Sequence, residues 1–281
     1  MIEGAWLVLR AAGLVLTFQA TGTALFSIVF ARQLTASAPG IYRLGRRAAL
    51  AALLILALQL LLEPAHMAGE WSGAADPAVL QMLRESPGAA ALAVRCVGLA
   101  CVAVGAGRGG PLLLLPAVCA VLGSFTLSGH TLSHDHRPVL AALLLVHLAI
   151  ITFWFGALLP LRQILSRASC ADAARVLAAF SAVALWLVPL IALAGAALAA
   201  LLLPDLAALG RPYGRLLLAK LTLFAALMGL AALNRLRLTP GLAAGQVPAA
   251  VWLRRSIALE YLLICAALAI SAVLTGSFSP D

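Results

Sequence analysis

The stretch VLAALLLVHLAIITFWFGALLPL, residues 139–161, decides the class of this protein. It contains no Asp, Glu, Lys or Arg, and a helix needs about 20 mostly apolar residues to cross the hydrocarbon core of a bilayer. The rest of the chain has the same character, with 64% of its 281 residues apolar, 10% charged and a mean hydropathy of +1.07. A soluble domain carries about 25% charged residues. The composition therefore predicts an integral helical membrane protein and excludes a soluble enzyme, a disordered chain and a disulfide scaffold.

Seven more apolar stretches accompany residues 139–161 and predict an all-α, polytopic membrane bundle of eight transmembrane helices. We expect residues 1–281 to form a single transmembrane domain. The second and fourth stretches are short for a crossing, so we expect them to extend into their flanks. Breaks between helices are expected at stretches that contain proline or glycine, the last of them at Thr239-Pro240-Gly241. The expected spans are residues 5–31, 47–62, 89–106, 112–127, 139–161, 173–203, 213–233 and 257–275.

The first and fifth spans share a short internal sequence similarity. Gly13 and Gly22 are nine residues apart in the first span, and His147 and Gly156 have the same spacing in the fifth. Both spans run in the same direction across the membrane and are followed by an Arg-Gln pair, so the similarity indicates a weak parallel 4+4 repeat. The two pairs are residues 32–33 and 162–163.

The charged residues divide between the two sides of the membrane. Twelve of the 19 basic residues fall in the four odd-numbered connections, which join spans 1–2, 3–4, 5–6 and 7–8. Most acidic residues fall in the even-numbered connections and near the termini. The positive-inside rule places the odd connections in the cytoplasm and both termini outside. This topology explains the net charge of +9, so we expect no nucleic-acid partner. The twelve are Arg32, Arg43, Arg46, Arg47, Arg108, Arg162, Arg167, Arg175, Arg235, Arg237, Arg254 and Arg255.

All five histidines fall on the outer side or in the outer half of the membrane. Three of them, His130, His134 and His136, form an HxxxHxH pattern between the fourth and fifth spans. Imidazole binds copper, zinc, iron and nickel, and three imidazoles so close together are typical of a metal site. The alternative is a hydrated loop whose imidazoles only face solvent.

His66 and Met67 form a second candidate, in the connection after the second span. A thioether beside an imidazole favours Cu(I) among the metals that imidazole binds. With Glu63 and Glu70 these residues have i, i+3, i+4, i+7 spacing, which puts all four on one face if the segment is helical. An acidic, solvent-exposed loop explains the segment equally well.

His147 differs because it lies inside a span, roughly 15 Å from its outer end at about 1.5 Å per residue. An ionisable residue in the bilayer is costly and marks a candidate functional site. Trp154 lies on the same face, so we expect both side chains to face the bundle interior. His147 is either a second ligand for an ion that arrives at His130, or a neutral histidine hydrogen-bonded to a neighbouring helix. Three roles are open for Lys220, the only lysine: it repels cations, it pairs with Asp205, or its side chain extends to the membrane surface.

Known catalytic motifs are absent from the sequence. It contains no GxSxG, P-loop, HExxH or glycine-rich dinucleotide pattern. We therefore expect neither enzymatic activity nor an ATP-driven pump.

Several stretches of the sequence resemble the CopD/PcoD family of inner-membrane copper resistance proteins. The most specific is RPYGRLLLAK at residues 211–220, which runs on to ALNR at 232–235. The others are SGH at 128–130, His147 with WFGALLPL at 154–161, and RRS at 254–256 followed by Glu260.

The resemblance implies a bacterial inner-membrane protein with periplasmic termini that moves copper from the periplasm toward the cytoplasm and contributes to copper homeostasis and resistance. It makes His130 and His147 the expected copper contacts, and a periplasmic copper carrier an expected partner. Relatives often carry a histidine at the place of Gly13, so we expect His134 or His136 to compensate here. We expect the copper as Cu(I). The alternatives are a b-type haem protein with paired histidine ligands and a copper-binding membrane protein without transport.

Overall fold

The computed structural model describes residues 1–34, 37–107, 110–127, 137–202 and 209–277, and the regular structure in these ranges is entirely helical. The first half contains α1 (Ile2–Val29), α2 (Ala38–Ala68), a short 3₁₀ helix η1 (Trp71–Ala75), α3 (Pro77–Glu85), α4 (Pro87–Gly105) and α5 (Gly110–Ser124). The second half contains α6 (Arg137–Arg167), α7 (Cys170–Leu202), α8 (Pro212–Leu233), a π-helical turn η4 (Asn234–Leu238), α9 (Thr239–Ala243) and α10 (Val247–Ser277).

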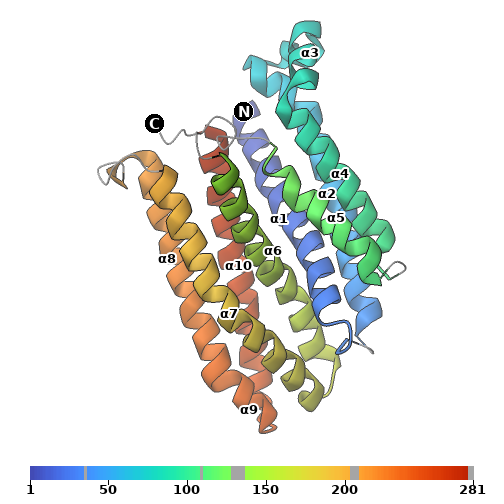
Figure 1. The fold of residues 1–281 in the computed structure, drawn as a ribbon, viewed down its shortest axis with the longest axis vertical. Coiled ribbons are helices and arrows are strands. Elements are labelled where there is room, and N and C mark those ends of the chain that lie inside the picture. The colour runs from blue at the N-terminus through green and yellow to red at the C-terminus, as the bar shows by residue number, and fades with distance from the viewer. Residues whose placement is uncertain (35–36, 108–109, 128–136, 203–208, 278–281) are drawn as a thin grey trace.

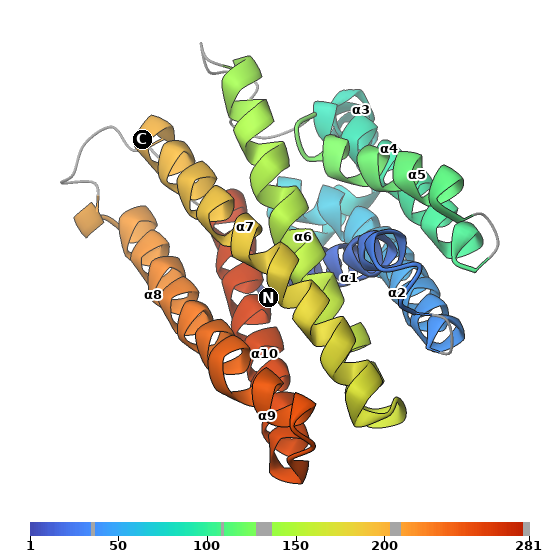
Figure 2. The same ribbon diagram turned by 60° about the horizontal axis from the view of Figure 1, so that its bottom comes forward.

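Helices α1 and α6 lie side by side in the middle of the molecule (Figure 1). α2, α4 and α5 pack on one side of this pair, and α7, α8 and α10 on the other, as two views of the fold show (Figures 1 and 2). Each side has its own apolar core. Small aliphatic side chains of α2, α4 and α5 close against α1, and aromatic rings of α1 and α6 close against α7 and α10.

Seven of the described helices are long and apolar enough to cross a membrane, and α5 is a shorter apolar helix beside α4. The prediction of a polytopic all-α membrane bundle is therefore confirmed. The second span extends beyond residues 47–62 as expected, since α2 runs from Ala38 to Ala68. The fourth does not become longer, because α5 begins slightly earlier than predicted, at Gly110, but ends at Ser124, before the predicted end at residue 127. Side-chain hydroxyls satisfy backbone carbonyls at this end, where Ser124 donates to Val121 O and Thr126 to Gly123 O.

The expected break at Thr239-Pro240-Gly241 is wrong. The helical path of α8 continues through η4 into α9, and Pro240 lies in the first turn of α9, where the missing N–H of proline is tolerated. The chain reverses later, at Gly245, whose φ of 76° is a left-handed conformation that glycine adopts without strain. As a result α10 begins at Val247, well before the predicted start at residue 257.

The helix ends divide between the two ends of the bundle. α1 begins and α10 ends at one end of the bundle, where α3 also lies (Figure 1). The helix ends that flank the four odd-numbered connections point toward the opposite end, where α9 also lies (Figure 1). Most of the arginines in the sequence fall in these connections. We call this second end the arginine-rich end and the first one the acidic end.

The centre of the fold is a backbone contact between α1 and α6. A Cβ atom added to Gly22 would overlap Thr152 O and would lie 2.8 Å from Gly156 Cα, and one added to Gly156 would overlap the Gly22 backbone. Only glycine permits this approach at both positions. Gln19 Nε2 and Thr23 Oγ1 reinforce it by donating to Gly156 O at 3.3 and 3.2 Å. Gly22 and Gly156 are the equivalent positions of the predicted repeat, so the two halves meet at matching points.

Candidate functional site

The HxxxHxH cluster lies outside the described residues, as does Asp205, the predicted partner of Lys220. His130, His134 and His136 therefore remain predictions. In the sequence the cluster ends immediately before Arg137, the first residue of α6. Within the part of the chain that the structure describes, no three His, Cys, Asp or Glu residues are placed to hold a metal ion together.

His66 and its neighbours lie on the last turns of α2, which continues to Ala68. The His66 ring stacks on Trp6 of α1 with centroids 4.0 Å apart and an angle of 16° between the planes. Trp6 Nε1 also donates to Glu63 Oε2 at 2.6 Å. Met67 and Glu70 are exposed, and Gly69 ends the helix before Glu70. The segment is thus helical, but His66 and Glu63 contact a buried tryptophan instead of converging with Met67 and Glu70.

Two arginines tie the helices together near the acidic end. Arg10 Nη2 donates to Thr275 O at 3.2 Å and to Thr275 Oγ1 at 3.0 Å, and its guanidinium lies 4.8 Å from the centre of the Trp6 ring. Arg95 Nε donates to Ser124 Oγ at 3.0 Å, with its guanidinium 3.8 Å from the Phe125 ring centre. These contacts join α1 to α10 and α4 to α5, so both arginines have structural partners in the bundle.

His147 lies on α6, ten residues after its first residue, and its ring rests on α7. A Cβ atom built on Gly195 of α7 would lie 3.4 Å from His147 Cε1. The Nδ1 atom is buried and has no hydrogen-bond partner among the described residues. A buried polar atom without a partner is unusual in a native structure and requires an explanation. The backbone of Ile191 on α7 also lies within hydrogen-bonding reach of the ring, so a metal ligand and a histidine bonded to a neighbouring helix both remain predictions for His147.

Gly13 occupies the corresponding place in the first half of the protein. A Cβ atom at Gly13 would lie 3.4 Å from Leu56 Cδ2 and 3.6 Å from Gln59 Oε1, both on α2. His147 contacts α7 just as Gly13 faces α2, and α2 and α7 are the second helices of the two halves. A side chain at this place would therefore project toward α2.

A buried polar cluster that the sequence did not reveal lies further along α6. Trp154 Nε1 donates to Glu260 Oε2 at 3.3 Å, and Asn234 Nδ2 donates to Glu260 Oε1 at 2.5 Å. Trp154 and Glu260 are 6% and 3% exposed, which confirms that Trp154 faces the interior. Glu260 is the fourteenth residue of α10, whereas the predicted start at residue 257 put it at a helix end. The signal available in the sequence was that Glu260 is the one charged residue in the stretch 257–275.

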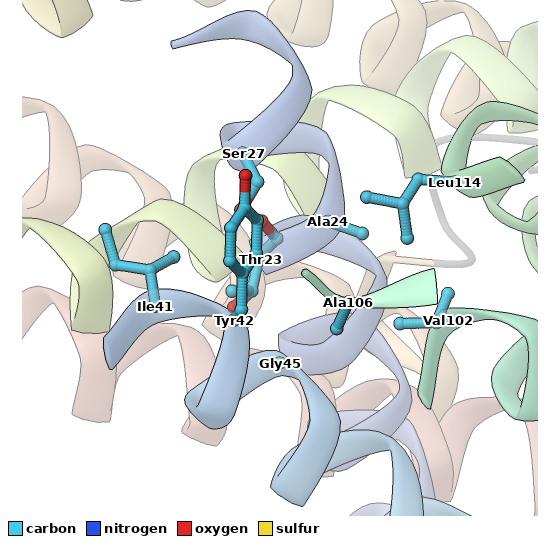
Figure 3. Close-up of a pocket in the computed structure, with 9 residues that line it drawn as sticks. All are labelled: Thr23, Ala24, Ser27, Ile41, Tyr42, Gly45, Val102, Ala106 and Leu114. Atoms are coloured by element: carbon cyan, nitrogen blue, oxygen red, sulfur yellow. The ribbon is translucent and has the colours of Figure 1, made fainter. Parts of the chain in front are cut away.

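A small pocket between α1, α2, α4 and α5 does not form a ligand site (Figure 3). Its volume is only about 10 Å³, close to the minimum for one water molecule. None of its lining residues is a histidine, cysteine or methionine, so it offers a soft metal no ligand. The lining residues are Thr23, Ala24, Ser27, Ile41, Tyr42, Gly45, Val102, Ala106 and Leu114.

The apolar helices and the ionisable groups buried between them define a multi-pass membrane protein. Comparison with known protein families shows which family of membrane proteins it belongs to. The model described as copper resistance protein D-like, N-terminal domain, matches residues 1–137, and that described as copper resistance protein D matches residues 174–274. The chain belongs to the copper resistance protein D family, and this membership supports a role in copper resistance. His147 lies between the two matched ranges. No curated protein and no solved structure matches the chain.

Proposed function

We propose that this protein takes copper from the periplasmic side of a bacterial inner membrane and moves it across the bilayer to the cytoplasm. The observation that carries the proposal is His147, an imidazole inside the bundle whose buried Nδ1 lacks a partner among the described residues. Imidazole nitrogen is a good copper ligand, and an ionisable group at this depth is retained for a function. Family membership supplies copper as the metal.

The proposed route begins at the acidic end, where His130, His134 and His136 capture the ion next to the start of α6. His66, whose ring stacks on Trp6, and the exposed thioether of Met67 are proposed as separate contacts at the same end. The ion then passes to His147. Met67 and neutral imidazoles favour Cu(I), and a periplasmic copper carrier is the proposed donor. The protein acts as a transporter and not as an enzyme.

The arginine-rich end is the proposed cytoplasmic end, so both termini are periplasmic. A cation moving inward gains about 2.3 kcal/mol per charge for each 100 mV of membrane potential. Chelation of copper in the cytoplasm adds to this driving force. No nucleotide-binding domain is needed for transport in this direction.

Replacing His147 by alanine tests the proposal in cells. The variant should lower copper accumulation while the protein still folds, because the substitution removes the ligand but no partnered hydrogen bond at Nδ1. Val146→Ala is the matched control, since Val146 is the neighbouring residue and is 46% exposed. Accumulation equal to that of the control would remove His147 from the route.

The haem alternative requires two histidines at one depth. His66, the other histidine within the described ranges, lies two residues before the end of α2 and stacks on Trp6, whereas His147 lies ten residues into α6. Pairing would thus require one of the three histidines before α6. An absorption spectrum of the purified protein decides between the two, because a Soret band appears only with haem.

A further inference from the structure

Glu260 is a carboxyl group in the middle of an apolar span. It is 3% exposed and is held by groups from two other elements, Trp154 of α6 and Asn234 of η4. Each carboxyl oxygen accepts one hydrogen bond, from an indole N–H and from an amide N–H. Both donors are neutral, so they orient the carboxyl group but do not neutralise its charge.

No basic side chain pairs with Glu260 in the described ranges, where Arg175–Asp172 is the single ion pair. Arg235 of η4 donates to Ser181 O and Oγ on α7, both at 2.9 Å. Arg255 lies over the Trp252 ring, 5.3 Å from its centre. Other ionisable groups lie on α10 itself and on the elements that pack against it. They include Arg10 of α1, His147 of α6, Lys220 of α8, Arg237 of η4, and Arg254 and Tyr261 of α10.

Arg10 is bound to Thr275, and Arg237 and Arg254 are exposed. His147 lies about two helical turns from Trp154, and Lys220 lies roughly 21 Å along α8 from Asn234. An ionised Glu260 would therefore be a buried charge without a counter-charge, which costs several kcal/mol. The arrangement fits a carboxyl group that is neutral until a cation comes near.

Two further observations mark the surroundings of Glu260 as a site. Asn234 begins the π-helical turn η4, and π-helical turns inside α-helices occur frequently at functional sites. In addition, Asn234 Oδ1 and Ser256 Oγ are buried without a partner among the described residues. Ser256 is 7% exposed and lies one turn before Glu260 on the same face of α10. These oxygen atoms are hard ligands that Cu(I) binds poorly, and they can accept a hydrogen bond from an O–H group.

We propose that Glu260, held by Trp154 and Asn234, is a proton-binding site that releases its proton when a copper ion passes through the bundle. This inference rests on the proposed function. The O–H bond of Glu260 breaks, the proton leaves to water at the arginine-rich end, and Cu(I) is neither oxidised nor reduced. The carboxylate then serves as counter-charge for the passing ion, so the net charge buried in the bundle stays the same. When the ion has left, the proton returns.

Glu260→Gln is the decisive variant. Its side-chain carbonyl still accepts from Trp154, and its amide N–H donates to Asn234 Oδ1 once the Asn234 amide turns over, but the proton site is gone. Asp172→Asn is the matched control, because Asp172 is an exposed carboxylate at the arginine-rich end that pairs with Arg175. Infrared spectroscopy of the purified protein follows the carbonyl band of a protonated carboxylic acid. A pH dye in weak buffer follows proton release when Cu(I) is added.

The wild type and Asp172→Asn should show the acid band, lose it when Cu(I) is added, and release about one proton per protein more than Glu260→Gln. The same acid band in wild type and Glu260→Gln would overturn the proton site. Copper uptake into proteoliposomes separates the two proposals. A wild type that takes up no copper contradicts the proposed function, whereas copper uptake with an unchanged acid band and equal proton release contradicts the proton site alone.

Discussion

Adding a single methyl group at Gly22 should force α1 and α6 apart. The new Cβ atom would overlap Thr152 O and come within 2.8 Å of Gly156 Cα, and both are backbone atoms that no rotamer change can move. Overpacking of this kind costs about 1–3 kcal/mol. The shift also lengthens the hydrogen bonds that Gln19 and Thr23 donate to Gly156 O, and each such bond is worth about 1 kcal/mol. We therefore expect the free energy of unfolding of Gly22→Ala to be about 2–5 kcal/mol below that of Gly229→Ala, in which alanine replaces glycine in a helix without any overlap.

Gly229→Ala supplies the control for this prediction. A Cβ atom at Gly229 on α8 meets nothing within 4 Å, and alanine is a better helix former than glycine by about 1 kcal/mol. Unfolding of both variants in detergent micelles, followed by circular dichroism against increasing denaturant, gives the two free energies. Equal stability of Gly22→Ala and Gly229→Ala would refute a backbone contact between the two halves at this point.

Two other substitutions test the remaining contacts of the candidate site. Trp6→Phe keeps a ring to stack on His66 but removes the N–H that Glu63 accepts, so the free energy of unfolding should fall by about 1–3 kcal/mol; an unchanged denaturation midpoint would contradict the role of this hydrogen bond. Gly195→Leu places a side chain against His147 Cε1 and should reduce copper uptake severalfold, measured against Gly229→Leu; normal uptake would show that copper does not use this side of the ring.

The sequence predicted the class of fold because hydropathy and charge act on the whole chain. Long apolar stretches can be satisfied only in a bilayer, and arginines cluster on one side of it. Helix ends were predicted less well. Pro240 was read as a break, but proline is compatible with a first helical turn, and the reversal depends on the left-handed conformation of Gly245. At the C-terminal end of α5, the hydroxyl groups of Ser124 and Thr126 donate to backbone carbonyls. A hydropathy average cannot predict such contacts.

The candidate site was predicted only in part. The inward orientation of Trp154 followed from its spacing after His147, because residues seven apart share a helix face. The stacking of His66 on Trp6 was not predicted, since it joins positions on two helices. The same reason hid the Glu260 cluster, whose members come from three elements. The meeting of Gly22 with Gly156 also required the structure, although the repeat had marked both positions.

Copper uptake by purified protein in proteoliposomes tests the central claim most directly. The liposomes contain a Cu(I) chelator and have an inside-negative membrane potential. Copper is supplied outside with ascorbate, which keeps it as Cu(I). The proposed route predicts rapid uptake by the wild type and by Val146→Ala, and uptake close to that of empty liposomes for His147→Ala. Uptake by His147→Ala at the wild-type rate, or none by the wild type, would contradict a copper route through His147.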